Sequence, residues 1–508
     1  MNRRTEFVVI LLGAAVCFAV AAARAFSVPL SSDIALQLHI AEALARGAQL
    51  GRDVIEVNPP LAAWLEVPVV QLAAAAGASS ALGHEVAVLL LGMVAVTLVA
   101  LAGSRLKVLQ RPWHLSAFSL AAALALALQA GLGVGQREQL AILLTLPHFV
   151  LLAARLEGAV TPRALAVTIG LAAGLGFALK PFFVLPLLLG EVLLLRRRGL
   201  RAAIGRPEVA VIAAVFVVYA LAIVVAAPGW LQSARAFWPL YAAYRPATFD
   251  DVMTRQGVVL AVSALALLAW VVARRAADPG SGLGDALAVA LAGFLVAMLA
   301  QRKPWIYLAI PSGVLSLLLL LAVVLETSGR VQSRTGRLLR ALLVLGTSLR
   351  VARYAWWLVH APVLSLFDRT SLADYTRLRA TLDSLRPGTT MAALSPTHGV
   401  TFPLVQDVQG IWTMRLPSLW PAISDAAQDD AHQQWLRGIV AEDLERHQPE
   451  VLLVLMPGTA YRWLGPLAMR DWRQWLAESP EGAAALAPYR PWRTVGDFSV
   501  LRRARPAP

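Results

Sequence analysis

The sequence has one cysteine and few charged residues for its length of 508. The single thiol, Cys17, excludes a disulfide framework and a thiolate metal cluster. It lies inside an apolar run, where a thiol behaves as a small hydrophobe, which argues against redox chemistry. Charged residues make up 15% of the chain and hydrophobic residues 58%, against about 25% and roughly 45–50% in soluble proteins. These proportions exclude a purely water-soluble protein and place most of the chain in lipid.

Motifs for metal, nucleotide and nucleic-acid binding are also missing. The eight histidines contain no HxxxH or similar ligand pair, and His39, although near Asp33, is interpreted as structural. No Asp-x-Asp motif of the nucleotide-sugar type is evident. The net charge of +14 does not indicate nucleic acid, because Arg and Lys punctuate apolar runs instead of covering one face of a soluble module.

Long apolar runs dominate what is present. A bilayer core about 30 Å thick needs about 20 apolar residues per helix. About eleven runs bounded by charge predict transmembrane helices at 7–26, 84–103, 114–133, 139–154, 164–179, 182–195, 209–227, 256–273, 286–300, 306–325 and 338–361. The predicted fold is therefore a polytopic α-helical membrane protein, with its membrane module over 1–361.

The distribution of Arg and Lys predicts the orientation. A cytoplasmic N-terminus places most cations inside, including Arg196, Arg197, Arg198, Arg201 and Arg206 in one turn. This positive-inside bias predicts a multi-pass membrane protein, with the residues after about 362 on the outer side. An alternative for the first run is a cleavable signal peptide, since Asn2-Arg3-Arg4 precedes it and Ala23-Arg24-Ala25 ends it.

Two stretches inside the membrane module are predicted as external loops. Residues 27–83 form the first periplasmic loop, in which Leu36, Ile40 and Leu44 recur at helical spacing. This spacing predicts an amphipathic helix along the membrane surface. The second loop, 228–255, carries Trp230, Trp238, Tyr241 and Tyr244, the amphipathic rings expected at a membrane interface.

The tail, 362–508, is predicted to be a periplasmic α/β domain. Helical patterns at 372–385, 433–448 and 467–478 alternate with strand-like runs at 390–395, 450–455 and 496–502. Such alternation favours a sheet covered by helices. The tail holds no phosphate-cradling glycine motif, so a lid or a partner-docking module is the interpretation for it.

Acidic residues of the first external loop are the strongest candidates for chemistry. A carboxylate just outside a membrane span is well placed to act as a base, because partial desolvation raises its pKa. Asp33 and Glu56 are such carboxylates, and Asn58-Pro59-Pro60 follows Glu56, with the next helix predicted to begin at Leu61. The alternatives are a helix N-cap for Asp33 and a solvated loop charge for Glu56.

These residues resemble a known family. An Asp shortly after the first span, a helix through Ala41-Glu42 to Gly47, and an acid ahead of Asn58-Pro59-Pro60-Leu61 resemble the first periplasmic loop of the membrane-embedded GT-C glycosyltransferases. These include the protein O-mannosyltransferases, the lipid A aminoarabinose transferases and the Rhizobium lipopolysaccharide core transferases. The resemblance is specific over about 30–84 and implies that Asp33 is the catalytic base and Glu56 its acidic companion. Many members carry Lys-Pro-Pro where this chain has Asn58, so a positive charge expected near the donor phosphate is missing.

Cations predicted on the same side of the membrane could supply that charge. They are Arg137, Lys180, Arg302 and Lys303, and Tyr307 lies beside the last two. Converging cations would bind a lipid phosphate, whereas the alternative is that they snorkel to the interface. Glu138 has two interpretations, a second acidic site residue of the GT-C type or the partner of a nearby cation.

The resemblance implies an inverting transfer of a sugar from a polyprenyl-phosphate donor to a hydroxyl of a lipid, glycan or protein acceptor in the cell envelope. It also implies that the transfer takes place at the periplasmic face of the bacterial inner membrane, where the tail would lie. No cofactor is required as far as the sequence can be read, and a divalent metal held by Asp33, Glu56 or Glu138 remains open. Besides donor and acceptor, the expected partners are membrane lipids and not nucleic acid. The alternatives are a transporter or flippase of lipid-linked glycans and a noncatalytic scaffold. Against transport, the chain shows no convincing internal repeat.

Overall fold

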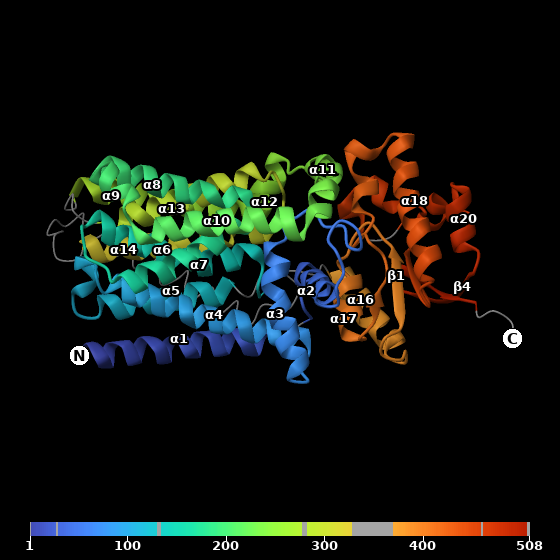
Figure 1. The fold of residues 1–508 in the computed structure, drawn as a ribbon, viewed down its shortest axis with the longest axis horizontal. Coiled ribbons are helices and arrows are strands. Elements are labelled where there is room, and N and C mark those ends of the chain that lie inside the picture. The colour runs from blue at the N-terminus through green and yellow to red at the C-terminus, as the bar shows by residue number, and fades with distance from the viewer. Residues whose placement is uncertain are drawn as a thin grey trace. The chain divides into compact units, whose positions relative to one another are not determined.

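The chain divides into two compact units, which we describe separately (Figure 1). The computed structural model describes residues 2–26, 29–129, 134–276, 282–327, 369–458 and 461–504. Unit 1 consists of Met1–Val28, Leu82–Leu221 and Ala247–Ala361, and unit 2 of Pro29–Ala81, Ala222–Pro246 and Pro362–Pro508. The domain boundary expected between residues 361 and 362 stays a prediction.

Unit 1 is built of helices. Its helices are α1 (Arg3–Ala25), α4 (Ser80–Gly103), α5 (His114–Gln129), α6 (Arg137–Leu156), α7 (Arg163–Ala178), α8 (Val184–Arg198), α9 (Leu200–Ile204), α10 (Pro207–Ala226), α12 (Phe249–Ala276), α13 (Leu283–Ala300) and α14 (Ile310–Thr327). Short 3₁₀ turns lie at Lys107–Gln110, Pro181–Phe183 and Ile306–Ala309. The first ten predicted spans all fall on helices of this unit, and the eleventh, 338–361, lies outside the described residues.

Not every predicted span is long enough to cross a bilayer. Seven helices of the described residues combine sufficient length with sufficient apolar character, namely α1, α4, α6, α10, α12, α13 and α14. The predicted span at 164–179 falls on the 16-residue helix α7, which is shorter than the roughly 20 residues required, and residues 130–133 of the span predicted at 114–133 lie outside the described residues. The chain is thus a multi-pass membrane protein, and the predicted number of eleven spans stays a prediction.

Burial separates the central helices of unit 1 from those at its surface. Within the most apolar window, 89% of α6 and 89% of α14 is buried, against 6% of α10 and 17% of α12. Helices that are apolar all round are expected in a core or against lipid. Small residues allow close packing in the core, because Gly176 of α7 lies against Leu144 and Thr145 of α6. The exposed apolar surfaces of α10 and α12 are those that lipid would cover.

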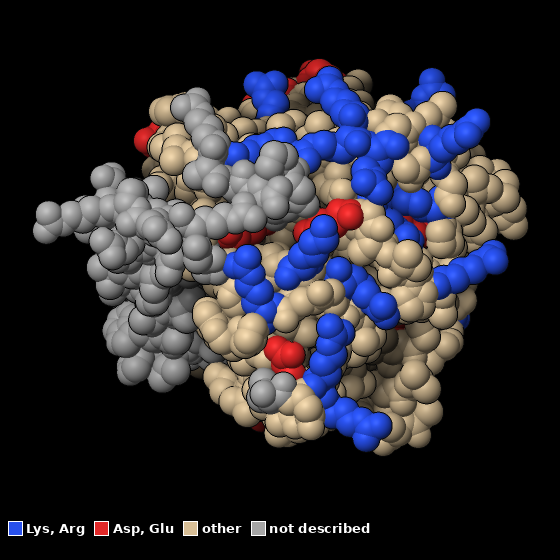
Figure 2. All heavy atoms as spheres, turned by 90° about the vertical axis from the view of Figure 1, so that its left-hand side faces the viewer, with Lys and Arg blue, Asp and Glu red and all other residues tan. Residues whose placement is uncertain are grey.

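One end of unit 1 is strongly basic. Figure 2 shows that Lys and Arg side chains gather on this face among few acidic ones. The helix ends and turns for which the sequence predicts a cytoplasmic location carry the exposed cations Arg105, Lys107, Arg111, Arg163, Arg196, Arg198 and Arg201.

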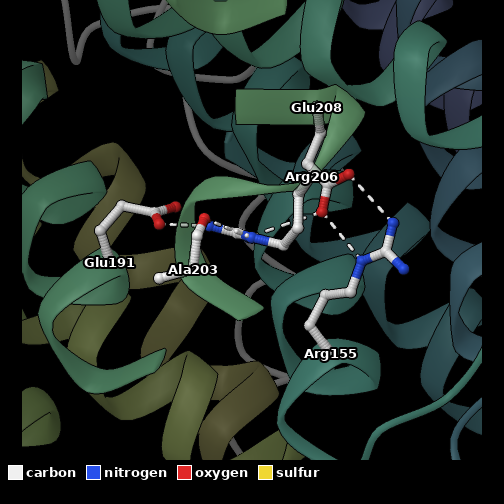
Figure 3. A network of polar contacts seen from close by, with 5 residues as sticks. All are labelled: Arg155, Glu191, Ala203, Arg206 and Glu208. Atoms are coloured by element: carbon white, nitrogen blue, oxygen red, sulfur yellow. Dashed lines mark hydrogen bonds and ion pairs between the residues drawn. The ribbon is translucent and has the colours of Figure 1, made fainter. Parts of the chain in front are cut away.

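A network of ion pairs ties helices together at the same end (Figure 3). The buried carboxylate of Glu208 accepts hydrogen bonds from Arg155 Nε at 2.9 Å and Arg155 Nη2 at 3.0 Å. Its Oε1 also lies 3.4 Å from Arg206 Nη1, and Arg206 in turn pairs with Glu191. Glu208 is 0% exposed, so its charge is compensated only by these arginines and not by water.

Unit 2 contains a five-stranded sheet in the order β2-β1-β3-β5-β4. The strands are β1 (Thr390–Leu394), β2 (Ile411–Trp412), β3 (Val451–Leu455), β4 (Tyr489–Val495) and β5 (Phe498–Arg503). β2, β1 and β3 are parallel, whereas β5 runs antiparallel to both β3 and β4. The helices from the tail are α16 (Arg369–Leu382), α17 (Thr401–Asp407), α18 (Asp430–His447), α19 (Trp472–Ala477) and α20 (Pro480–Leu486). The tail thus combines helices with a sheet, and its identity as an extramembrane α/β domain stays a prediction.

The two earlier segments supply the other helices of unit 2, which are α2 (Ser32–Ala45), α3 (Leu61–Ala75) and α11 (Pro228–Ala243). Ser424 Oγ donates to the carbonyl of Leu240 at 2.6 Å, and the Phe237 ring packs 5.0 Å from that of Trp435. Of the aromatic residues predicted in the second loop, Tyr241 and Tyr244 pack against Trp420 of the tail, at 5.7 Å and 5.5 Å between ring centroids. Gly51, at a φ of +86°, lies so close to Gly229 that a Cβ atom there would meet the Gly229 carbonyl.

The first-loop helix is buried within unit 2, and its predicted position along the membrane surface stays a prediction. α2 is a helix where predicted, but Gln37 and His39 are as buried as Leu36 and Ile40. The reason is that α3 and α17 both pack on it: Gln37 Nε2 donates to Glu66 Oε1 at 3.4 Å, and the His39 ring lies 5.3 Å from that of Phe402. Burial lowers the pKa of His39 to about 4, which keeps the imidazole neutral.

Candidate functional site

Asp33 lies in the first turn of α2. The N-cap of this helix is Ser31, whose side chain makes no capping hydrogen bond. The alternative interpretation of Asp33 as the N-cap is therefore wrong. Its Oδ1 instead lies 3.0 Å from Nε2 of His398, with side-chain exposures of 30% and 26% for Asp33 and His398. Asp33 is thus part-buried and contacts a ring from the tail, 365 residues later in the sequence.

His398 is a residue that the sequence analysis missed. It lies in the loop that follows β1, at the carboxyl end of the parallel part of the sheet, where α/β proteins commonly place functional groups. The sequence pattern did not indicate His398, because a single histidine in a loop forms no motif with a second residue at a defined spacing. Its position after a predicted strand at 390–395 is the one signal that could have singled it out.

Glu56 and Asn58 form a local turn. Glu56 Oε1 accepts hydrogen bonds from the Asn58 backbone N at 2.7 Å and from Asn58 Nδ2 at 2.6 Å. Trp230 Nε1 donates to the Asn58 carbonyl at 3.1 Å, and α3 begins at Leu61 as predicted. Glu56 is therefore a structured, half-buried carboxylate and not a freely solvated loop charge.

Lys180 and Glu138 form a buried ion pair in unit 1. Lys180 Nζ lies 2.5 Å from Glu138 Oε1 and 3.2 Å from Gln301 Oε1. The ammonium group is also 5.8 Å from the centroid of the Tyr307 ring, within cation–π range. The Lys180 side chain is 11% exposed and that of Glu138 1%. Of the two interpretations of Glu138, the structure shows pairing with a cation, and Lys180 does not extend into solvent.

One oxygen of this pair is unsatisfied. Among the residues that the structure describes, Oε2 of Glu138 is buried without a hydrogen-bond partner. A buried, unpaired polar atom is costly, so it is a place where a polar substrate group or an ion would be stabilised. The pair as a whole is electrically neutral, and additional positive charge for a phosphate must come from other cations.

The other predicted cations differ in exposure. Arg137 is the first residue of α6 and is half-buried, Arg302 is exposed at a φ of +50°, and Lys303 is 5% exposed. Ala247 N donates to the Arg302 carbonyl at 2.8 Å, and Gln256 Nε2 donates to the Lys303 carbonyl at 3.3 Å. These bonds to α12 and the residues before it fix the backbone that carries both cations.

The predicted site residues thus fall into two groups. Asp33, Glu56 and Asn58 belong to unit 2, and the remainder, Arg137, Glu138, Lys180, Arg302, Lys303 and Tyr307, belong to unit 1. No three His, Cys, Asp or Glu side chains within the described parts of the chain come together as a metal-binding group. The prediction that no cofactor is required, with a divalent metal left open, stays a prediction.

Removing Lys180 alone is expected to destabilise unit 1. Lys180→Met leaves the buried Glu138 charge uncompensated, a change that costs about 3–5 kcal/mol. The double variant Glu138→Gln/Lys180→Met is expected to recover most of this loss. Thermal unfolding of the detergent-purified proteins measures the effect, and an unaltered stability of Lys180→Met would show that the pair does not hold the helices together.

Comparison with known proteins gives matches by structure only. No protein-family model matches the sequence, and no curated protein matches it. The crystal structure of ArnT from Cupriavidus metallidurans bound to undecaprenyl phosphate is 15% identical, has a TM-score of 0.58, and is matched over 99% of this chain and 100% of that chain. The apo state of the same protein gives 14% identity and a TM-score of 0.56, with 100% of both chains covered.

A more distant match is the archaeal oligosaccharyltransferase AglB from Archaeoglobus fulgidus, in complex with an inhibitory peptide and a dolichol-phosphate. It is 13% identical with a TM-score of 0.47, over 97% of this chain and 74% of that chain. The likeness to ArnT extends over both units, including the tail that the sequence resemblance did not cover. The chain therefore has the fold of ArnT, and the resemblance to the GT-C glycosyltransferases is confirmed at the level of the fold.

Proposed function

We propose that this protein is an inverting glycosyltransferase of the GT-C type. It transfers a sugar from a polyprenyl-phosphate donor to a hydroxyl group of a lipid, glycan or protein acceptor. The observation that carries the proposal is the likeness to ArnT over nearly the whole chain, in a structure that holds undecaprenyl phosphate. The part-buried Asp33, held by His398, supports it by providing a carboxylate fixed in orientation.

In the proposed reaction Asp33 is the general base. One of its oxygens takes the proton of the acceptor hydroxyl while the acceptor oxygen bonds to the anomeric carbon. The bond from that carbon to the phosphate oxygen breaks on the opposite face, and its electron pair leaves with the lipid phosphate. The sugar is thereby transferred with inversion.

Charge develops on the departing phosphate, so cations contribute more than a general acid would. We assign this role to Arg137, Arg302 and Lys303, with Lys180 orienting the phosphate as one half of its pair with Glu138. Glu56 fixes Asn58, and the polar turn that they form is assigned to substrate orientation. Asp33, Glu56 or Glu138 would supply a carboxylate ligand to a divalent metal.

The basic end of unit 1 supports the proposed orientation. Exposed cations gather there (Figure 2), and cytoplasmic turns of membrane proteins carry an excess of Lys and Arg. We therefore propose that this end is cytoplasmic, that the protein lies in the bacterial inner membrane, and that Asp33 and the tail are periplasmic.

The proposal is tested with purified protein in vesicles containing undecaprenyl-phosphate-linked sugars. The expected result with a suitable donor is that acceptor addition releases free undecaprenyl phosphate, and that NMR of the product shows the inverted anomeric configuration. Transport of the intact donor across the bilayer, with no cleavage of the sugar–phosphate bond, would support a flippase and contradict the proposal.

A further inference from the structure

The loop after β1 fixes His398 before any substrate binds. Ser395 Oγ donates to the Thr397 carbonyl at 2.9 Å, and Gly399 N donates to Thr397 Oγ1 at 3.0 Å. At the start of the loop, Leu419 N donates to the Ser395 carbonyl at 2.7 Å. Hydrogen bonds therefore fix the backbone on both sides of His398, independently of the contacts that the His398 ring makes.

The ring of His398 is also packed. It meets Phe402 edge-on at 6.4 Å between centroids, and Phe402 lies 4.9 Å from Trp412 and 5.3 Å from His39. Phe402 is 0% exposed, so this aromatic group is part of the core of unit 2. Because His39 belongs to α2, the same aromatic contact connects the loop that carries His398 to the helix that carries Asp33.

The bond between the two side chains has a defined direction. If Asp33 acts as a base it is ionised and can only accept, so His398 must carry a hydrogen on Nε2 and donate it to Oδ1. A carboxylate has two oxygens, and a bond at Oδ1 is compatible with proton transfer to Oδ2. The hydrogen bond from a fixed ring restricts rotation of the carboxylate, which is what a general base requires.

We infer that His398 is a positioning residue for the reaction, and that the tail contributes it to the site of Asp33. This inference rests on the proposed function and adds to it a role for the tail, which the sequence suggested to be a lid or a docking module. His398 donates its Nε2 hydrogen to Asp33 throughout turnover and takes no proton from the acceptor. It acts on the rate through the orientation of Asp33, not through contact with the sugar.

The test uses the full-length protein in the vesicle assay, with three variants. His398→Ala removes the donor and is expected to lower kcat about 10–100-fold, with the donor KM changed less than about 3-fold. His398→Gln keeps an amide N–H donor. Its decrease in log kcat is expected to be at most half of the decrease caused by His398→Ala. His432→Gln is the matched control, because His432 contacts Asp429 at 2.6 Å on the exposed start of α18, and it is expected to turn over like the wild type.

A readout besides turnover separates positioning from folding. In protein labelled at its eight histidines, the NMR signal of the His398 ring, identified by its absence in His398→Gln, is expected to move in Asp33→Asn and to stay in Asp53→Asn. Wild-type kcat in His398→Ala, or a His398 signal indifferent to Asp33→Asn, would overturn the inference alone. Failure of the wild-type protein to transfer sugar from any donor would overturn the proposed function, and the inference with it.

Discussion

Asp33→Asn is expected to lower glycosyl transfer about 10²–10⁴-fold, the range that a positioned general base contributes. Asparagine keeps the shape of the side chain, and its amide oxygen still accepts the His398 bond, but it cannot take a proton from the acceptor. Donor binding is expected to be unchanged, so the loss appears in kcat. Initial rates of undecaprenyl phosphate release in vesicles measure it.

The matched control is Asp53→Asn, in the same loop. Asp53 pairs with Arg52 at 2.9 Å and caps Gln49 N at 2.9 Å, and the bond from Arg52 is the main reason that its pKa lies below the usual value. Because the Asp53 carboxylate bonds to residues of its own turn, its replacement is expected to leave kcat within about 3-fold of the wild type. Near-normal turnover by a well-folded Asp33→Asn protein would remove Asp33 as the base.

Glu208→Ala is expected to lower the stability by about 3–5 kcal/mol, a loss as large as that expected for Lys180→Met. The carboxylate is 0% exposed, and its removal leaves the side chains of Arg155 and Arg206, 17% and 6% exposed, without their shared partner (Figure 3). Glu208→Gln is expected to fall between the wild type and Glu208→Ala, because it keeps acceptor oxygen and volume but loses the charge. Unfolding of the purified protein in mixed detergent micelles measures the difference.

A surface pair provides the comparison. Glu450 accepts a hydrogen bond from Arg386 at 3.0 Å, but the two side chains are 47% and 77% exposed. Glu450→Ala is expected to change stability by less than about 0.5 kcal/mol, since water replaces the lost partner. Equal effects of Glu208→Ala and Glu450→Ala would mean that burial does not strengthen the network.

The length of the hydrophobic runs predicted most of the helices of unit 1. A helix that crosses a bilayer needs a minimum number of apolar residues and few charged ones. The tail was predictable in part for a related reason: β1, β3 and β5 are apolar runs with flanking turns. β4 was not predicted, because a segment that contains Pro491 and two arginines lacks the pattern typical of a strand. Proline is tolerated there since β4 is an edge strand that pairs only with β5.

The sequence could indicate single residues of the candidate site, but it could not indicate which residues contact them. Asp33 and Glu138 could be named because membrane boundaries make acids conspicuous. Their partners, His398 and Lys180, lie 365 and 42 residues away in the sequence, and no periodicity links them. The burial of α2 was missed for the same reason, since its covering helix α17 comes from the tail.

The discontinuity of unit 2 bears on how the protein is made. Its three segments leave the ribosome at widely separated times, and the bond from Ile55 N to the Arg415 carbonyl cannot form until most of the chain has been synthesised. Until then, α2 of the first segment has its contact with α3 but lacks its contact with α17. A nascent chain that stops short of the sheet would leave α2 with bare apolar surface, which makes completed synthesis a checkpoint for assembly of this unit.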